Sequence, residues 1–177
     1  MNGIFHPAIA SWFSERYGTP TTVQSEAWPV ISRGENVLVV APTGTGKTLA
    51  AFLWALNQLI TGVWTCGETR VLYISPLRAL NNDIRRNLIV PLGELETLFR
   101  KKGLDYPSID VKTRSGDTPM EERRKMVRYP PEIFITTPES LNLILASPRA
   151  RRILSGIRTV ILDEIPVSYT HLRAHET

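Results

Sequence analysis

The sequence predicts an α/β fold in which a mostly parallel β-sheet is flanked by helices. Short continuous apolar runs alternate with amphipathic helical patterns along the chain, which is typical of successive β–α–β units. With 177 residues, of which 42% are hydrophobic and 21% charged, the chain has the balance of a globular protein and room for one domain. This composition excludes a disordered chain, and no apolar run reaches the length of a membrane span.

The apolar runs are the predicted strands. Residues 36–40 and 70–75 are continuous in apolar character, as expected for strands that a sheet buries on both faces. Residues 109–113 are a weaker candidate, and residues 133–136 and 159–162 complete the set. Because parallel strands are joined by crossover helices, helical patterns are expected between these runs.

The helical patterns fall where such crossovers are needed. Leu49, Phe52, Leu53, Leu56 and Ile60 share one face of a helix predicted over residues 47–60. Further helices are predicted from Pro76 past Leu88, over 121–125 with an acid–base pair four residues apart, and in the region before residue 36. Residues 138–146 and a basic stretch, 149–152, separate the last two strand runs. The large aromatic residues in these patterns are assigned to the core rather than to base stacking. They are Trp12, Trp28 and Trp54.

Charge and cysteine content indicate which partners and which cellular compartment to expect. Lysine and arginine exceed aspartate and glutamate by four, a modest excess that permits an anionic partner without proving one. The single Cys66 forms no internal disulfide, and the sequence holds no Cys/His cluster for zinc. The first five residues lack an export signal, so the reducing cytoplasm is the expected compartment.

The segment Ala41–Thr48 is the most informative part of the sequence. It is glycine-rich and lies between a predicted buried strand and an amphipathic helix, the context of a phosphate-binding loop, although the strict pattern begins with Gly where Ala41 stands. Its glycines let successive N–H groups point into one concavity, and the helix N-terminus adds partial positive charge. Lys47 would reach the β- and γ-phosphates, and the Thr48 hydroxyl would ligate Mg²⁺. The predicted nucleotide-binding residues here are Thr43, Gly44, Thr45, Gly46, Lys47 and Thr48.

An acidic pair follows the last apolar run. Asp163 and Glu164 come directly after residues 160–162, where an aspartate can hold Mg²⁺ together with Thr48 and a glutamate can activate the attacking water. Acids at a strand end also serve as caps of a following helix, and that alternative stays open from the residues alone. The predicted catalytic residues are Glu164 and Lys47, and the predicted metal ligands are Thr48 and Asp163.

Taken together, these segments resemble the first RecA-like domain of a superfamily-2 helicase, most closely the large helicase-related (Lhr) branch of the DExH proteins. The resemblance covers residues 1–165 and implies a P-loop NTPase fold, here truncated, with ATP and Mg²⁺ as cofactors. It also implies that Gln24 reads the adenine edge. The matching segments are 17–24 (Q motif), 41–48 (motif I), 75–80 (motif Ia), 115–118 (motif Ib), 136–141 (the next nucleic-acid motif) and 162–165 (the start of motif II).

The same resemblance implies a single-stranded nucleic acid as partner, with DNA favoured over RNA. Strand ends and helix starts can grip a sugar–phosphate chain through N–H groups and short hydroxyls, which carries no sequence information. Thr113 and Arg114 lie at such a place, whereas Arg123 and Arg124 are predicted to form a solvated face and residues 138–140 could be only a helix start. The predicted nucleic-acid contacts are Pro76, Arg78, Gly116, Asp117, Thr137, Pro138 and Ser140.

The end of the chain departs from the family. Pro166 stands where the resemblance leads one to expect histidine, and residues 166–177 show no apolar periodicity. They resemble the translation of a transposon-end sequencing adapter, so they are expected to be a non-native tail. The expected division is an N-terminal helical and Q-motif region (1–35), an incomplete ATP-binding domain (36–165) and this tail (166–177). The resemblance implies that a second RecA-like domain, with its arginine finger, is missing.

Two function classes follow. The first is an enzyme: the chain is the N-terminal part of an ATP-dependent DNA helicase. The family is catalytic, but this fragment is expected to be inactive by itself. The second is a catalytically silent fragment that binds nucleotide and nucleic acid. An RNA helicase or another P-loop translocase is the remaining alternative.

Overall fold

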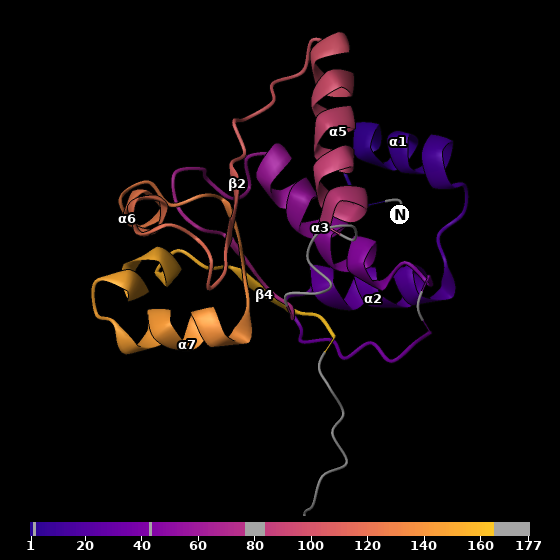
Figure 1. The fold of residues 1–177 in the computed structure, drawn as a ribbon. Helices are drawn as coiled ribbons and strands as arrows, with labels where there is room; N and C mark the ends of the chain where they lie inside the picture. Colours follow the sequence, from indigo (N-terminus) through magenta and orange to yellow (C-terminus); the bar gives the residue numbers. More distant parts are fainter. Residues whose placement is uncertain (2, 43, 77–83, 165–177) are drawn as a thin grey trace, which may run out of the picture.

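The structure is a computed structural model that describes residues 1, 3–42, 44–76 and 84–164 (Figure 1). Helices and strands alternate along these residues in the order that the sequence predicts for β–α–β units. The elements are α1 (Pro7–Tyr17), α2 (Thr22–Ser32), α3 (Lys47–Ile60), β1 (Val71–Ile74), the π-helical η1 (Arg85–Ile89), α5 (Val90–Lys101), β2 (Val111–Arg114), α6 (Met120–Arg128), β3 (Ile133–Thr136), α7 (Pro138–Ala146), the 3₁₀ turn η2 (Ala150–Leu154) and β4 (Thr159–Leu162).

The four strands form one sheet in the order β2-β3-β1-β4, and every pairing in it is parallel. Val71 at the start of β1 lies opposite Ile133 and Thr159, so the strands are in step. All four carboxyl ends therefore meet at one edge of the sheet, which we call the carboxyl edge, and the four amino ends meet at the opposite, amino edge. The predicted parallel α/β fold is confirmed.

One predicted strand is wrong. Residues 36–40 form no strand, and all of them except the half-buried Val39 are exposed, with Leu38 81% and Val40 89% exposed. An apolar run becomes a buried strand only when neighbouring strands pair with it, and among the described residues β4 ends the sheet without pairing to this run. Val160 and Leu162 of β4 remain about half exposed as well. The other predicted runs do form strands, with 109–113 shifted to Val111–Arg114.

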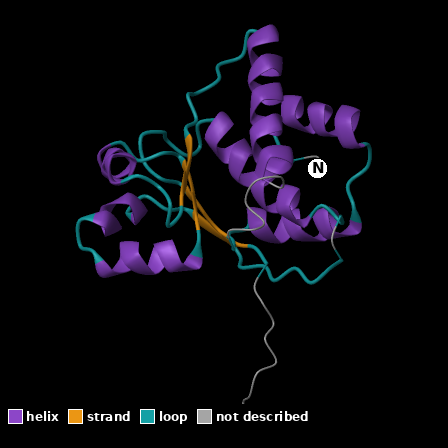
Figure 2. Ribbon diagram, viewed as in Figure 1, coloured by secondary structure: helices purple, strands orange, loops and turns teal. Residues whose placement is uncertain are grey.

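Helices cover both faces of the sheet (Figure 2). On one face α1, α2, α3 and α5 enclose the larger core, in which Phe13, Trp28, Phe52 and Tyr73 are fully buried. On the other face α6, α7 and η2 cover a smaller cluster around Phe134. Trp12 and Trp28 are buried and Trp54 packs against the larger core, which agrees with their assignment to the core.

The predicted helices also form. The helix predicted from Lys47 to Ile60 agrees with α3 at both ends. The segment between the last two strand runs, for which the sequence predicted only a possible helix start at 138–140, forms α7. The acid–base pair on α6 is present, with Lys125 Nζ 2.8 Å from Glu121 Oε1. Of the helix predicted from Pro76, the described residues are helical from Ile84 onward, Pro76 itself is not helical, and residues 77–83 lie outside the described residues. Within the described residues no helix is long and apolar enough to cross a membrane.

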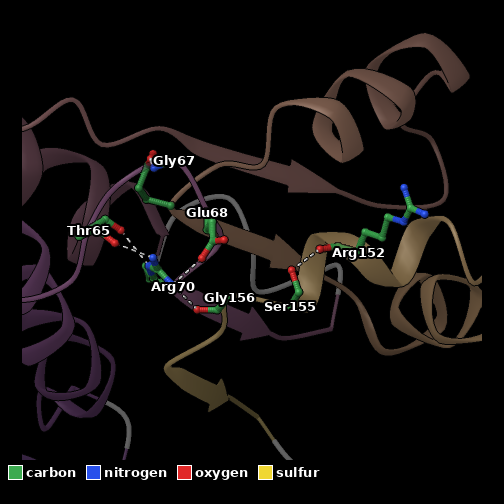
Figure 3. A network of polar contacts seen from close by, with 8 residues as sticks. Thr65, Gly67, Glu68, Arg70, Arg152, Ser155 and Gly156 are labelled. Atoms are coloured by element: carbon green, nitrogen blue, oxygen red, sulfur yellow. Dashed lines mark hydrogen bonds and ion pairs between the residues drawn. The ribbon is translucent and has the colours of Figure 1, made fainter.

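A network of hydrogen bonds and an ion pair around Arg70 connects the loops at the amino edge of the sheet (Figure 3). Arg70, which precedes β1 and is 7% exposed, donates from Nε and Nη2 to the carbonyl and hydroxyl of Thr65, at 2.8 and 2.7 Å. Its Nη1 donates to the Gly156 carbonyl at 3.0 Å and pairs with Glu68 at 2.8 Å. Each nitrogen of this buried guanidinium therefore has a partner.

A buried carboxylate completes the amino edge. Glu132, which is 5% exposed, accepts hydrogen bonds from the backbone N–H groups of Gly67 and Asp110, both at 2.7 Å. It therefore joins the loop before β1 to the segment that leads into β2. Arg70 and Glu132 are therefore both occupied in holding the chain at this edge.

Candidate functional site

The glycine-rich loop lies at the carboxyl edge, immediately before α3. Gly44 and Gly46 have left-handed backbone angles, with φ 83° and φ 81°, which glycine adopts readily. Gly46 is the N-cap of α3 and provides no side-chain cap, so the first turn presents free N–H groups. Such an exposed helix N-terminus with a glycine turn in front of it is suited to bind an anion. Thr43, predicted to belong to this site, lies outside the described residues.

Lys47 folds back over the loop. Its Nζ donates to the carbonyls of Ala41 and Pro42, the latter at 2.7 Å, and the Thr45 hydroxyl also donates to the Pro42 carbonyl, at 2.8 Å. The ammonium group is therefore held at the loop by neutral carbonyls. Because no carboxylate neutralises Lys47 in the described residues, its positive charge is available to a phosphate.

Gln24 contacts the loop from α2. Its side-chain oxygen accepts from the Thr21 N–H at 3.0 Å, completing a capping box, and its Nε2 donates to the Gly46 carbonyl at 3.4 Å. The Thr21 hydroxyl also bonds to the Thr45 carbonyl at 2.9 Å. The side chain of Gln24 is 3% exposed, so in this state it supports the loop. Its predicted role in reading adenine remains a prediction.

The acidic pair lies beside the start of α3. The Thr48 hydroxyl donates to Asp163 Oδ2 at 3.3 Å, although the two residues are far apart in sequence. Asp163 thus meets the loop, while the exposed Glu164 follows it with a left-handed φ of 49° and donates its N–H to Asp163 Oδ1 at 2.9 Å. A hydroxyl and a carboxylate are the oxygen donors that Mg²⁺ takes from a protein when phosphates supply further ligands. The donor set therefore fits Mg²⁺.

Sequence reasoning missed Tyr73. Its hydroxyl donates to Asp163 Oδ2 at 2.6 Å, while its ring stacks on Phe52 within the core. The tyrosine stands inside an apolar strand, so the sequence pattern assigns it to the core. The signal that could have found it is its place one residue from the carboxyl end of a strand, where a hydroxyl can reach the neighbouring strand end.

The other predicted contact residues follow the remaining strands at the same edge. Thr137 caps α7, its hydroxyl accepting from the Ser140 N–H at 3.3 Å, and both residues are 3% exposed. Pro138 begins that helix, and Pro76 lies two residues beyond the end of β1. The structure thus brings these residues to the edge that carries the phosphate loop. Arg78 lies outside the described residues.

The turn after β2 carries Gly116 and Asp117 and is held from α6. Arg123 donates from Nε to the Thr118 carbonyl at 2.7 Å and from Nη2 to the carbonyls of Ser115 and Gly116, at 3.3 and 2.6 Å. The prediction that Arg123 belongs to a solvated face is therefore wrong, because tertiary folding places the turn over its helix. Arg124, its neighbour, is exposed as predicted.

A glycine-rich loop leads directly into α3, its lysine folds back over it, and Thr48 faces Asp163. This arrangement is that of a P-loop nucleotide-binding domain. Sequence comparison then narrows the class. The sequence model of the DEAD/DEAH box helicase family matches residues 21–171, and the chain belongs to this family.

Similar proteins come from several organisms. The chain is 49% identical over 175 residues to the Lhr helicase/probable uracil glycosylase of Mycolicibacterium smegmatis. The aligned segment covers 98% of this chain and 12% of that protein. It is 49% identical over 165 residues to the ATP-dependent helicase Lhr-Core of Sulfolobus acidocaldarius, covering 92% of this chain and 18% of the relative. The chain therefore spans less than a fifth of the length of either relative.

Solved structures agree. The structure of Mycobacterium smegmatis helicase Lhr bound to ssDNA and AMP-PNP superposes with a TM-score of 0.82 at 49% identity, over 90% of this chain and 20% of that one. The DUF1998 helicase MrfA bound to DNA and AMPPNP superposes with a TM-score of 0.66 at 25% identity, over 92% of this chain and 21% of that one. The predicted RecA-like fold and the resemblance to the Lhr type are confirmed.

Proposed function

We propose that this chain is the N-terminal part of an ATP-dependent helicase or translocase of the Lhr type. The observation that carries the proposal is the contact of Thr48 with Asp163, which joins the phosphate loop to the acidic strand end at 3.3 Å. A motor of this kind needs its triphosphate-binding and metal-binding groups at one place. Similarity to Lhr helicases over nearly the whole chain supports the same proposal.

ATP is the proposed nucleotide and Mg²⁺ its metal. The loop amides and Lys47 would hold the phosphates, while Thr48 and Asp163 would hold the metal, which supplies charge neutralisation at the phosphates. Glu164, exposed beside Asp163, would orient and deprotonate the attacking water. The Lhr structure of M. smegmatis was solved with AMP-PNP, which supports this assignment.

Single-stranded nucleic acid, DNA rather than RNA, is the proposed partner. The turn with Gly116 and Asp117 and the start of α7 at Thr137 lie at the ends of adjacent strands, β2 and β3, so one strand backbone could pass both. Free N–H groups at such places bind phosphates without reading bases. The M. smegmatis Lhr structure contains ssDNA, which supports the assignment.

We further propose that the 177 residues alone do not turn over ATP at a motor's rate. The division into residues 1–35, 36–165 and 166–177 is part of the proposal, with the last segment adapter-derived. In related nucleotidases an arginine finger accelerates turnover about 10³- to 10⁵-fold. The resemblance implies that a second RecA-like domain supplies this arginine in a helicase. Amplifying the locus from genomic DNA tests the tail, because genomic coding of residues 166–177 would contradict it.

Nucleotide binding is the direct test. A fluorescent ATP analogue with Mg²⁺ should bind the wild-type chain, and Lys47→Ala should weaken binding about tenfold to a hundredfold because a charge-assisted phosphate contact is lost. Lys125→Ala, which removes an exposed lysine on α6, is the matched control and should bind like wild type. Equal affinity of Lys47→Ala and wild type would contradict the phosphate-loop assignment.

The silent-fragment alternative is separated by hydrolysis. ATP turnover should stay at the background set by Lys47→Ala, with and without single-stranded DNA. A DNA-stimulated rate would show that the fragment is itself an enzyme. Competition between DNA and RNA strands of equal length for the chain then tests the choice of nucleic acid, and preferential binding of RNA would favour an RNA helicase.

A further inference from the structure

Arg114 is a cation buried at the carboxyl edge of the sheet. It ends β2 and is 6% exposed, and its Nε has no hydrogen bond. No ion pair of its guanidinium is found within residues 1, 3–42, 44–76 and 84–164. Burial of a charge is costly unless it is paired, so a guanidinium in this state is expected to meet an anion during function.

The side chain of Arg114 faces α6. Residues of a strand alternate between faces, and Val111 packs against the larger core, so Arg114 lies on the opposite face, where Met126 of α6 contributes to the smaller core. The charge of Arg123, also on α6, is close enough to add to burial in lowering the pKa of Arg114. No carboxylate contributes to this shift among the described residues, so the two cations lie together uncompensated.

Arg123 has donors to spare. Its Nε and Nη2 hold three carbonyls of the turn, while no partner of its Nη1 is found among the described residues. An arginine carries five N–H donors in a rigid planar fork, and phosphate oxygens match that fork. The contacts to the turn fix the Arg123 guanidinium in place, so little side-chain freedom would be lost on binding an anion.

The surrounding surface favours an anion. Residues 120–158 contain eight lysines or arginines and four aspartates or glutamates, an excess of four, which equals the excess of the whole chain. The remaining residues therefore carry no net charge. The positive charge of the protein is concentrated on the segment that follows the turn and includes α6, α7 and η2, which raises the local concentration of a polyanion.

We propose that Arg114 and Arg123 together form a binding site for one backbone phosphate of the nucleic acid, at the base of the turn formed by residues 115–118. Arg123 has a double role: it positions the turn through three carbonyls and donates to the phosphate. The two arginines would add positive charge beside the turn that contacts the nucleic acid. This proposal rests on the proposed nucleic-acid function.

Binding of a fluorescein-labelled oligothymidine, followed by anisotropy, tests the site. Arg114→Met and Arg123→Met should each weaken binding about tenfold or more, since a charge-assisted hydrogen bond to phosphate is lost. Arg124→Met, which removes an exposed charge from the same helix, is the matched control and should stay within about twofold of wild type. The dependence of log K on log salt concentration should fall by about 0.7 in Arg114→Met, the value for one phosphate on a single strand.

Unfolding in urea separates binding from folding. Arg114→Met should unfold at the same or a higher urea concentration than wild type, because no ion pair of the buried charge is found among the described residues. Arg123→Lys keeps a charge but not the fork, so its affinity should lie between those of wild type and Arg123→Met. The phosphate site would be refuted if Arg114→Met bound with wild-type affinity, or if its loss of affinity were matched by a loss of stability. Either result would leave the proposed nucleic-acid function standing. Failure of the wild-type chain to bind the oligonucleotide would refute the nucleic-acid function as well.

Discussion

Two arginines, buried to nearly the same extent, lie at opposite edges of one sheet. Arg70, before β1 at the amino edge, is 7% exposed and Arg114, at the end of β2, is 6% exposed. The first donates to Thr65 and Gly156 and pairs with Glu68, whereas Nε of the second has no partner. The two arginines are therefore equally buried but differ in whether the described residues supply partners for the guanidinium group.

The contrast indicates that polar groups at the amino edge stabilise the fold, whereas groups at the carboxyl edge have donors left for a ligand. At the amino edge, Arg70 and Glu132 join loops that would otherwise separate. At the carboxyl edge, the amides of α3 and the guanidinium of Arg114 remain with unused donors. In open parallel sheets ligands bind outside the carboxyl ends of the strands, which agrees with this division.

Replacement of Arg70 gives the largest expected effect. Arg70→Met should lower the free energy of unfolding by about 2–4 kcal/mol, because buried carbonyls lose a charged donor that Met cannot replace. Urea unfolding, with Arg114→Met as the matched variant at the other edge, measures the contrast. Equal destabilisation by the two substitutions would remove the distinction between the edges.

Glu132→Gln sharpens the assignment of the amino edge. The carboxylate accepts from two backbone N–H groups through its two oxygens, whereas an amide has one oxygen, so one N–H loses its partner. The expected loss is about 1–3 kcal/mol of unfolding free energy. Affinity for the ATP analogue should not change, and a weaker affinity in the folded variant would show that the two edges are coupled.

Gly46→Ala compares two glycines at the carboxyl edge. A Cβ at Gly46 would lie 2.4 Å from Nε2 of Gln24, whereas a Cβ at Gly44 meets nothing within 4 Å, and both residues have positive φ. Each alanine should cost about 1–2 kcal/mol in backbone strain, and only Gly46→Ala should also displace Gln24 from the loop. Nucleotide affinity and urea unfolding of the two variants decide, and identical affinities would contradict a supporting role for Gln24.

Tyr73→Phe gives the smallest expected effect. It removes the hydroxyl that donates to Asp163 at 2.6 Å and leaves the aromatic ring in the core. Unfolding free energy should fall by about 1 kcal/mol, the net value of one hydrogen bond. The change should weaken Mg²⁺-dependent nucleotide binding more than binding without Mg²⁺, measured by titration of the ATP analogue. An equal effect under both conditions would separate Tyr73 from the metal site.

Much of the fold and of the site follows from local sequence pattern. The helix over residues 47–60, the strand runs at 133–136 and 159–162 and the glycine loop all form where the sequence predicts them. The acidic pair also lies where expected, with Asp163 meeting Thr48. These features depend on periodicity, on glycine conformation and on the rule that the ends of parallel strands share one edge, and all of these can be seen in the order of residues.

Only the tertiary structure decides which strands pair and which buried charged side chains find partners. Residues 36–40 have the pattern of a buried strand yet form none, because a strand needs a neighbouring edge that the sequence of the run does not contain. The same holds for buried charge, because Arg70 and Arg114 look alike in the sequence as arginines beside apolar runs. Only the surrounding loops give Arg70 its partners, while Nε of Arg114 has none within the part of the chain that the structure describes. Hydrophobic period and backbone preference are properties of neighbouring residues, so sequence alone determines them. Desolvation and hydrogen-bond satisfaction depend on residues distant in the chain, so tertiary structure decides them.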